Sequence, residues 1–170
     1  DDEYRSHVSQ IAAGKAGAVA TQLSQLQTAT SLATSLLDVT QTPGEQRQML
    51  ERAYQTFPDL ESLDLAPWGQ VTMGYPNQPR ADVALDLLSP NTATSPLLAA
   101  AREGRSAVLY TTASTGQTDD LAIMFQPLRT KAASGDRFWG FVLASRRISA
   151  VLWSAGLPTL AQEHLDYWLE

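Results

Sequence analysis

The first forty residues have the simplest pattern of apolar and polar positions in the chain. From Tyr4 to Val39 there is no proline, and apolar or small side chains recur three or four positions apart, with Lys15 as the exception. Such spacing predicts a helix with one narrow apolar stripe. At 1.5 Å per residue this helix would span roughly 50 Å. Because that exceeds what a compact domain of this size needs, we expect part of the helix to protrude.

The stripe is compatible with two arrangements. Its spacing is that of a heptad seam, so it could pair two copies of the chain. The surrounding surface is Ser, Thr, Gln and Ala rather than Glu and Lys, so such pairing would be weak in isolation. The alternative is a helix lying fully against its own domain. We expect residues 1–41 to form a stalk and dimerisation helix, with an interface made by Ile11, Val19, Leu23, Leu26 and Leu37.

A second helix and a hairpin follow. In the segment 42–45 (TPGE), threonine is the expected N-cap, proline takes the first helical position and glutamate completes a capping box. The helix is expected to run to about Thr56. Residues 60–65 then alternate as a half-buried strand, and the turn 67–70 (PWGQ) leads to a second strand over 71–75. These two strands are expected to form a hairpin.

The second half of the chain predicts one short helix, three more strands and further helices. The helix begins at Ser95 and Pro96 and stops at Gly104. The strands cover 107–112, 121–126 and 138–145, and helical segments begin at Ile148 and Thr159. Sequential strands joined by short loops pair antiparallel. The expected fold class is therefore α+β: a long N-terminal helix followed by a five-stranded, mainly antiparallel sheet flanked by helices.

Composition narrows the function classes. A length of 170 residues with 44% hydrophobic side chains suits one folded domain with an appended helix. A formal net charge of -6 disfavours nucleic acid, whose phosphates need clustered Lys and Arg. No apolar run approaches the roughly 20 residues that cross a bilayer. Since the chain opens on Asp1 and stops inside an apparently helical stretch, we expect a fragment whose membrane segments lie just outside it.

Enzymatic chemistry has little support in the sequence. The absence of cysteine excludes disulfides, thiol nucleophiles and thiolate metal sites. The serine-hydrolase elbow, the P-loop and the dinucleotide fingerprint are missing. The two histidines, His7 and His164, stand at opposite ends of the chain. We therefore expect no enzyme, no metal and no cofactor.

An aromatic and sulfur-bearing group on the expected strands is the candidate binding site. If Tyr110, Met124, Gln126 and Phe141 share the face covered by residues 68–88, they would line a cavity with a few polar tips. If they pack tightly they are only core, which the pattern alone favours. Arg80 and Asp86 are the charged candidates in the loop that would close the cavity, although they could equally form a loop salt pair. The candidate ligand-binding set is Trp68, Met73, Tyr75, Arg80, Asp86, Tyr110, Met124, Gln126 and Phe141.

Seven short runs, taken in order and spacing, resemble a known family. They are 65–71 (LAPWGQV), 74–76 (GYP), 84–88 (ALDLL), 99–104 (AAAREG), 125–127 (FQP), 138–142 (FWGFV) and 155–157 (AGL). Together they resemble the CHASE domain, an extracellular sensory domain associated with cyclases and histidine kinases. The likeness covers about residues 60–168, and it implies that residues 42–170 form a PAS-like CHASE sensor domain.

The resemblance also implies a function. It implies the periplasmic ligand-sensing domain of a bacterial inner-membrane receptor, passing a small-molecule or peptide signal through transmembrane helices. The cytoplasmic output would be a histidine kinase, a diguanylate cyclase (GGDEF) or a cyclic di-GMP phosphodiesterase, and the receptor would be a homodimer joined by the N-terminal helix. The alternative is a protein-interaction module whose pocket is filled by its own side chains and whose input is a periplasmic partner protein. Ligand identity is left open.

Overall fold

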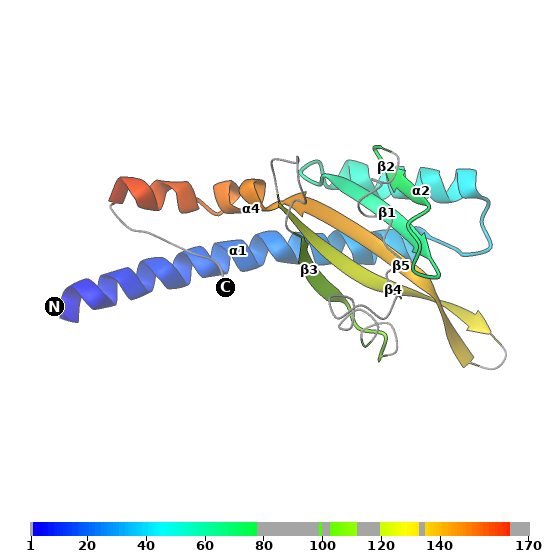
Figure 1. Ribbon diagram of the computed structural model, residues 1–170, viewed down its shortest axis with the longest axis horizontal. Helices are drawn as coiled ribbons and strands as arrows, with labels where there is room; N and C mark the ends of the chain where they lie inside the picture. Colours follow the sequence, from blue (N-terminus) through cyan, green and yellow to red (C-terminus); the bar gives the residue numbers. More distant parts are fainter. Residues whose placement is uncertain (1, 78–98, 100–102, 112–119, 133–134, 164–170) are drawn as a thin grey trace.

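The structure is a computed structural model that describes residues 2–77, 99, 103–111, 120–132 and 135–163 (Figure 1). Side chains are described in the same ranges except at 109–111, 131–132 and 161–163. The elements in chain order are α1 (Asp2–Leu36), α2 (Pro43–Thr56), β1 (Ser62–Pro67), β2 (Met73–Tyr75), β3 (Ala107–Thr111), β4 (Leu121–Ala132), β5 (Gly135–Arg147), α4 (Ile148–Ser154) and the 3-10 helix η1 (Leu157–Glu163).

The five strands form one antiparallel sheet in the order β2-β1-β5-β4-β3. The α+β prediction and the predicted hairpin of β1 and β2 are confirmed. The central pairing joins β1 to β5, with Leu63 opposite Ala144 and Leu65 opposite Val142. Strands from the two ends of the sheet-forming region therefore meet in the middle of the sheet.

Helix α2 begins where the sequence predicts it. The Thr42 side chain accepts a hydrogen bond from the backbone N–H of Glu45, and the Glu45 carboxylate accepts one from the backbone N–H of Thr42 at 2.8 Å. This capping box satisfies two backbone donors that the helix itself leaves unpaired. Because these hydrogen bonds favour the ionised form, the backbone N–H of Thr42 first and its hydroxyl second lower the pKa of Glu45 from 4.5.

The two halves of α1 have different neighbours. The second half lies across the sheet, where Leu26, Ala29 and Ala33 are buried. The first half extends beyond the sheet, and α4 and η1 run beside it (Figure 1). Lys15, the exception in the apolar stripe, donates a hydrogen bond to the carbonyl of Gly156 at 2.8 Å. A lysine there satisfies a carbonyl at the end of α4, which explains the polar position.

The stripe predicted to join two copies packs within one chain instead. Leu26 is 1% exposed, Leu37 is buried, and Leu23 packs against the same core. Ile11 and Val19 pack against Ala155, Leu157 and Leu160 of the segment around η1. These side chains are engaged by the chain's own domain, which is the alternative that the sequence left open. The boundary at residue 41 stays a prediction, although residues on both sides of it share one core.

Several predicted elements differ in extent from the structure, and the largest differences are in the second half of the chain. Strands β4 and β5 are longer than expected, because a polar hairpin around residues 129–138 continues their pairing beyond a register shift at Leu128 and Arg129. The segment 157–163 is a 3-10 helix rather than the start of an α-helix. The short helix expected before Gly104 falls mostly outside the described residues, and Gly104 itself has the predicted left-handed backbone with φ 69°. In the described part of the chain, no helix combines the length and the apolarity that a membrane crossing requires.

Candidate ligand-binding face

Alternation along the strands gives the sheet two different faces. The inner face carries Leu63, Leu65, Ala122, Met124, Leu128, Val142 and Ala144, which pack against α1 and α2. The opposite face, called the outer face below, carries Ser62, Asp64, Ala66, Leu121, Ile123, Phe125, Phe141, Leu143 and Ser145. Cross-strand partners share a face, and the register of β1, β4 and β5 fixes this assignment.

An aromatic group forms the centre of the outer face. The rings of Phe125 and Phe141 meet edge to face with centroids 6.1 Å apart, and Phe138 contacts Phe141 in the same manner at 5.0 Å. Phe141 is 0% exposed and Phe125 is also buried. Edge-to-face contacts of this kind fix ring orientation. The outer face therefore offers a rigid apolar wall.

A carboxylate lies beside this aromatic wall. Asp64 is 7% exposed and accepts a hydrogen bond from the hydroxyl of Ser62 at 2.6 Å. The hydroxyls of Ser62 and Ser145 lie 2.8 Å apart. An ionised carboxylate has about four acceptor positions, and the serine hydroxyl takes one of them. Two hydroxyls and one carboxylate thus form a compact polar group that can receive hydrogen-bond donors.

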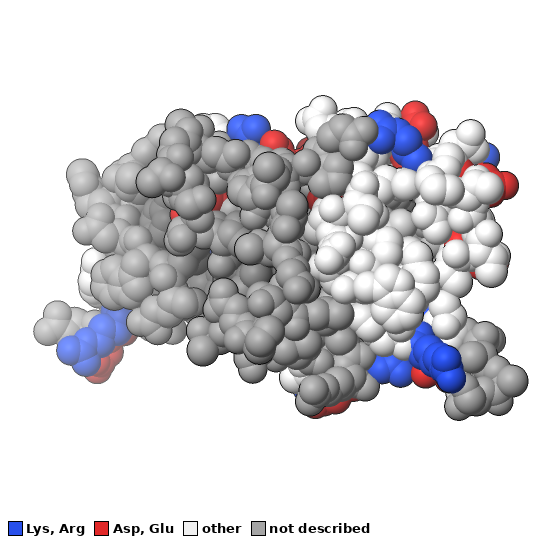
Figure 2. All heavy atoms as spheres, turned by 45° about the vertical axis from the view of Figure 1, so that its right-hand side comes forward, with Lys and Arg blue, Asp and Glu red and all other residues white. Residues whose placement is uncertain are grey.

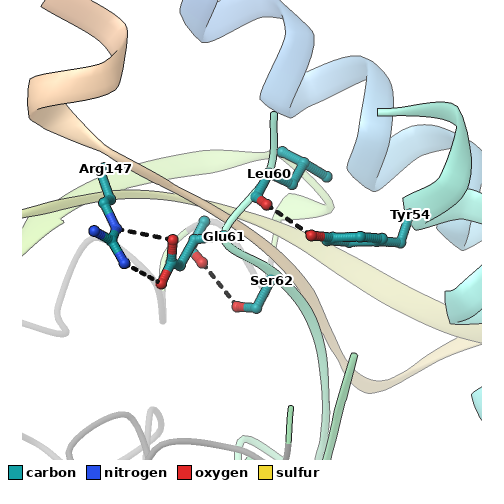
Figure 3. Close-up of polar contacts among 6 residues, drawn as sticks. Tyr54, Leu60, Glu61, Ser62 and Arg147 are labelled. Atoms are coloured by element: carbon teal, nitrogen blue, oxygen red, sulfur yellow. Dashed lines mark hydrogen bonds and ion pairs between the residues drawn. The ribbon is translucent and has the colours of Figure 1, made fainter. Parts of the chain in front are cut away.

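Contacts at the start of β1 fix the position of the polar group made by Ser62, Asp64 and Ser145 (Figure 3). The guanidinium of Arg147 donates two hydrogen bonds to the carboxylate of Glu61, at 2.9 and 3.1 Å. The hydroxyl of Tyr54 donates to the carbonyl of Leu60 at 3.1 Å. The backbone N–H of Glu61 donates to the carbonyl of Ser145 at 2.8 Å. These contacts hold β1 in register with β5 and so hold Asp64 in place.

The predicted ligand-binding residues do not share one face. Met124 belongs to the inner core, and Gln126 accepts a hydrogen bond from Ser31 of α1 at 2.9 Å. Phe141 points to the outer face, because it is opposite Pro127 while Gln126 is opposite Val142. The prediction that these residues share one face is therefore wrong. Along a strand, neighbouring side chains point to opposite faces, so a shift of one residue in the register is enough to separate them.

Two further predicted residues lie on the helix side of the sheet. Met73 and Tyr75 pack against the inner core, and the Tyr75 ring meets Tyr54 edge to face at 5.2 Å. The Tyr75 hydroxyl donates to the carboxylate of Glu51 at 3.2 Å. Desolvation first, and the negative charge of Glu51 second, raise the pKa of Tyr75 above 10.0. Tyr75 therefore anchors β2 to α2.

The remaining predicted residues are dispersed or lie outside the description. Trp68 occupies the turn between β1 and β2 with φ 54° and is 64% exposed. The backbone of Tyr110 pairs with Ala122, and its side chain is outside the described residues. Arg80 and Asp86 are also outside them. The ligand-binding role of every residue in the set stays a prediction.

The polar group on the outer face was missed by reasoning from sequence. In the run 60–65 the aspartate alternates with leucines, a pattern that predicts a solvent-exposed position. Burial of Asp64 depends on the sheet order and on the rest of the fold, neither of which the local pattern contains. No sequence signal would have identified it.

Solved structures include proteins of similar fold. No family model matches the sequence, and no curated protein does. The ligand-binding domain of the amino-acid chemoreceptor PctC of Pseudomonas aeruginosa, solved with GABA, is similar with a TM-score of 0.67 and 14% identity. The similarity covers 90% of this chain and 68% of that one. An extracellular ligand-binding receptor from Desulfohalobium retbaense is similar with a TM-score of 0.61 and 10% identity, over 85% of this chain but only 26% of that one.

Proposed function

We propose that the chain is the extracellular ligand-sensing domain of a bacterial membrane receptor, located in the periplasm, and that its outer face takes the ligand. The observation that carries this proposal is Asp64, a buried carboxylate on the same face of the sheet as Phe125 and Phe141, away from α1 and α2. Pockets that are mainly apolar and aromatic, with a few fixed polar groups, are typical of small-molecule sites. The likeness in fold to two ligand-binding receptor domains supports it.

The chemistry of the outer face favours a ligand with an amino group. An ammonium group and a carboxylate form a charge-assisted hydrogen bond, and the aromatic wall would contact the apolar part of the ligand. GABA, which is bound by the structurally similar PctC domain, carries an amino group. We therefore propose a small amine, such as an amino acid, as the ligand class.

The ligand would act by shifting a conformational equilibrium. A ligand can shift an equilibrium only by its difference in affinity for the two states. Strand β5 carries Phe141 and Ser145 and continues directly into α4, which lies beside α1 (Figure 1). A change in β5 would therefore reach both helices. We also propose that the receptor carries a cytoplasmic output domain, which would be a histidine kinase, a diguanylate cyclase or a phosphodiesterase. Membership of the CHASE family is a further part of the proposal.

A homodimer also remains part of the proposal, through a different surface from the one first expected. The side chains of Leu26 and Leu37 are buried in the chain's own core. Pairing through α1 would therefore have to use the opposite side of the helix. Sedimentation velocity at rising concentration measures this directly, and a monomer throughout would remove the dimer from the proposal.

A second candidate is favoured by one observation. Phe141 is 0% exposed and Phe125 is also buried, which is the packing expected of a filled core. In that case the chain would be a protein-interaction module whose input is a periplasmic partner protein. The same residues thus serve both candidates, and only binding experiments separate them.

Thermal unfolding with a ligand panel separates the two candidates. We would measure the melting temperature with each common amino acid and with GABA, and compare GABA with butyrate, which lacks the amino group. A ligand of the folded state raises the melting temperature with the logarithm of its concentration. The proposal predicts such a rise for at least one amine, lost in Asp64→Asn and kept in the control Asp136→Asn at the exposed hairpin. If no amine raises it, the filled module is the better account.

A further inference from the structure

A second candidate site lies on the inner side of the sheet, away from Asp64. A cavity of about 300 Å³ opens between α1, the turn from α2 to β1 and the end of β5. One part of its lining is apolar and is made by Leu26, Phe57, Pro58 and Leu60. Arg146, on β5 immediately before α4, also lines it. The volume is at the lower end of the range of small-molecule sites, which run from about 300 to 1,000 Å³.

Arg146 is a deeply buried cation. It is 3% exposed, and most of its hydrogen bonds go to neutral oxygens. Its guanidinium donates to the side-chain amide oxygens of Gln22 and Gln25, and to the hydroxyl of Ser154 at 3.1 Å. Its Nε atom is buried and has no hydrogen-bond partner in the part of the chain that the structure describes.

The charge of Arg146 is only weakly compensated. Within the described residues it forms one ion pair, with Asp59, at 3.6 Å between Nη2 and Oδ2, and the Asp59 side chain is 72% exposed. That distance exceeds a hydrogen bond, and the exposed side of the pair is screened by water. A buried cation destabilises the fold unless it is paired and hydrogen-bonded. A buried donor without a partner in a native protein therefore requires an explanation.

We propose that this cavity binds a small monocarboxylate with an apolar body, with its carboxylate on Arg146 and its body against Leu26, Phe57 and Leu60. A guanidinium presents a planar fork of donors that matches a carboxylate, which makes arginine the usual partner for such an anion. The ligand would compete with Asp59 for the guanidinium. This site goes beyond the proposed function, since it lies on the other side of the sheet and takes a group of opposite charge.

The place of Arg146 gives such a ligand a structural consequence. Its partners come from α1, from α4 and from the turn before β1. A carboxylate that displaces Asp59 would release the turn before β1 from Arg146, while the hydrogen bonds from Arg146 to α1 and α4 stay in place. The ligand would thus act at the point where α1 and α4 contact the end of β5.

The first test compares benzoate with benzamide, which has a similar shape and no charge. Binding to the 170-residue chain would be followed by nuclear magnetic resonance of the side-chain N–H of Arg146 and the amide of Gln25. We expect saturable shifts of both signals with benzoate and at least tenfold weaker binding of benzamide. Equal binding of the two compounds, or benzoate shifts confined to other residues, would overturn the proposal.

The second test removes the internal competitor. Asp59→Asn should tighten benzoate binding about three- to tenfold, because the guanidinium then has no carboxylate of its own. Glu61→Gln changes the net charge equally, but Glu61 pairs with Arg147 and does not line the cavity, so benzoate binding should stay within twofold. If Asp59→Asn leaves the affinity unchanged or weakens it, the site does not exist as proposed.

The third test changes Arg146 itself. Arg146→Gln should abolish benzoate binding, whereas Arg146→Lys should retain part of it. Where Arg146→Gln does not fold, the comparison of Asp59→Asn with Glu61→Gln still decides. The response to an amine on the outer face should be the same in Asp59→Asn as in the parent chain, so the failure of one proposal is distinguishable from the failure of the other.

Discussion

The two faces of the sheet are built from the same strands but differ in the side chains that they carry. The inner face is aliphatic, and α1 and α2 cover it with Leu26, Ala29, Leu50 and other small or branched side chains. The outer face combines phenylalanine rings with Asp64 and two serines. Apolar side chains would fill a purely structural face at lower free energy than a buried carboxylate. This contrast is what the proposed function predicts, with stability concentrated on the inner face and ligand binding on the outer one.

On the face drawn in Figure 2, the described residues form no large patch of one charge. In the view of Figure 2, Lys, Arg, Asp and Glu of the described residues are scattered at the margins, and most of the described surface between them is uncharged. The charged side chains at the two proposed sites, Asp64 and Arg146, are buried instead. Variants at these positions are therefore the most informative ones.

The largest expected effect belongs to the inner face. Leu50 is fully buried between α2 and the sheet, so Leu50→Ala should lower the free energy of unfolding by about 2–5 kcal/mol. Urea denaturation measures this loss. Met49→Ala, at a partly buried neighbour in the same helix, is the control and should lose clearly less. Equal losses in the two variants would show that the loss does not follow the degree of burial in the inner core.

The next largest effect is expected at the pairing of β1 with β5, which contributes side chains to both faces of the sheet. A Cβ at Gly140 would lie 2.4 Å from the carbonyl oxygen of Ala66 and 2.9 Å from the Cα of Pro67, so β1 and β5 approach too closely for a side chain there. Gly140→Ala should destabilise the fold by about 1–3 kcal/mol. Gly44→Ala, where a Cβ meets nothing within 4 Å, is the control and should be neutral or stabilising. A stable Gly140→Ala variant would contradict this register.

A smaller effect is expected at the helix that covers the inner face. Thr42→Ala removes the N-cap of α2 and should lower the free energy of unfolding by about 1 kcal/mol at neutral pH. Thr28→Ala, exposed on α1 with its hydroxyl donating to the carbonyl of Ser24, should change it little.

The same cap has a defined pH dependence. Because the folded-state pKa of Glu45 is lowered from 4.5, its contribution is fully present above 4.5 and is lost as the pH falls through the lower folded value. The difference between parent and Thr42→Ala should therefore shrink in acid, as measured by denaturation at pH 7 and pH 3. A difference that is unchanged at pH 3 would show that the hydrogen bond from the Thr42 hydroxyl to the Glu45 carboxylate contributes nothing, because the bond from the Thr42 backbone N–H is present in both proteins.

Local features of the fold were predictable and the assembled face was not. The capping box at Thr42, the helix of residues 4–39 and the antiparallel hairpin follow from spacing and turn chemistry within a few residues. The pairing of β1 with β5 joins distant segments, and no local pattern specifies it. That pairing decides that Phe141 and Asp64 lie on the face opposite to Met124 and Gln126, so the predicted binding set was divided.

The smallest effect on stability, and the largest on binding, is expected at the outer face. Asp64→Asn keeps the shape of the side chain and an acceptor for Ser62, so the free energy of unfolding should fall by less than in Leu50→Ala. The response to an amine ligand should disappear. A loss of several kcal/mol would instead identify Asp64 as half of a structural charge pair, because breaking a buried pair has an effect of about 3–5 kcal/mol.

The most direct measurement of the central claim is a nuclear magnetic resonance titration of the chain with the common amino acids and GABA. The account predicts that at least one of these amines shifts the backbone signals of Asp64, Phe141 and Ser145 in a saturable way, and that the buried α1 residues Ala29 and Ala33 shift much less. If every amine leaves the three outer-face signals unmoved, or shifts both groups alike, the outer face is not the ligand-binding site.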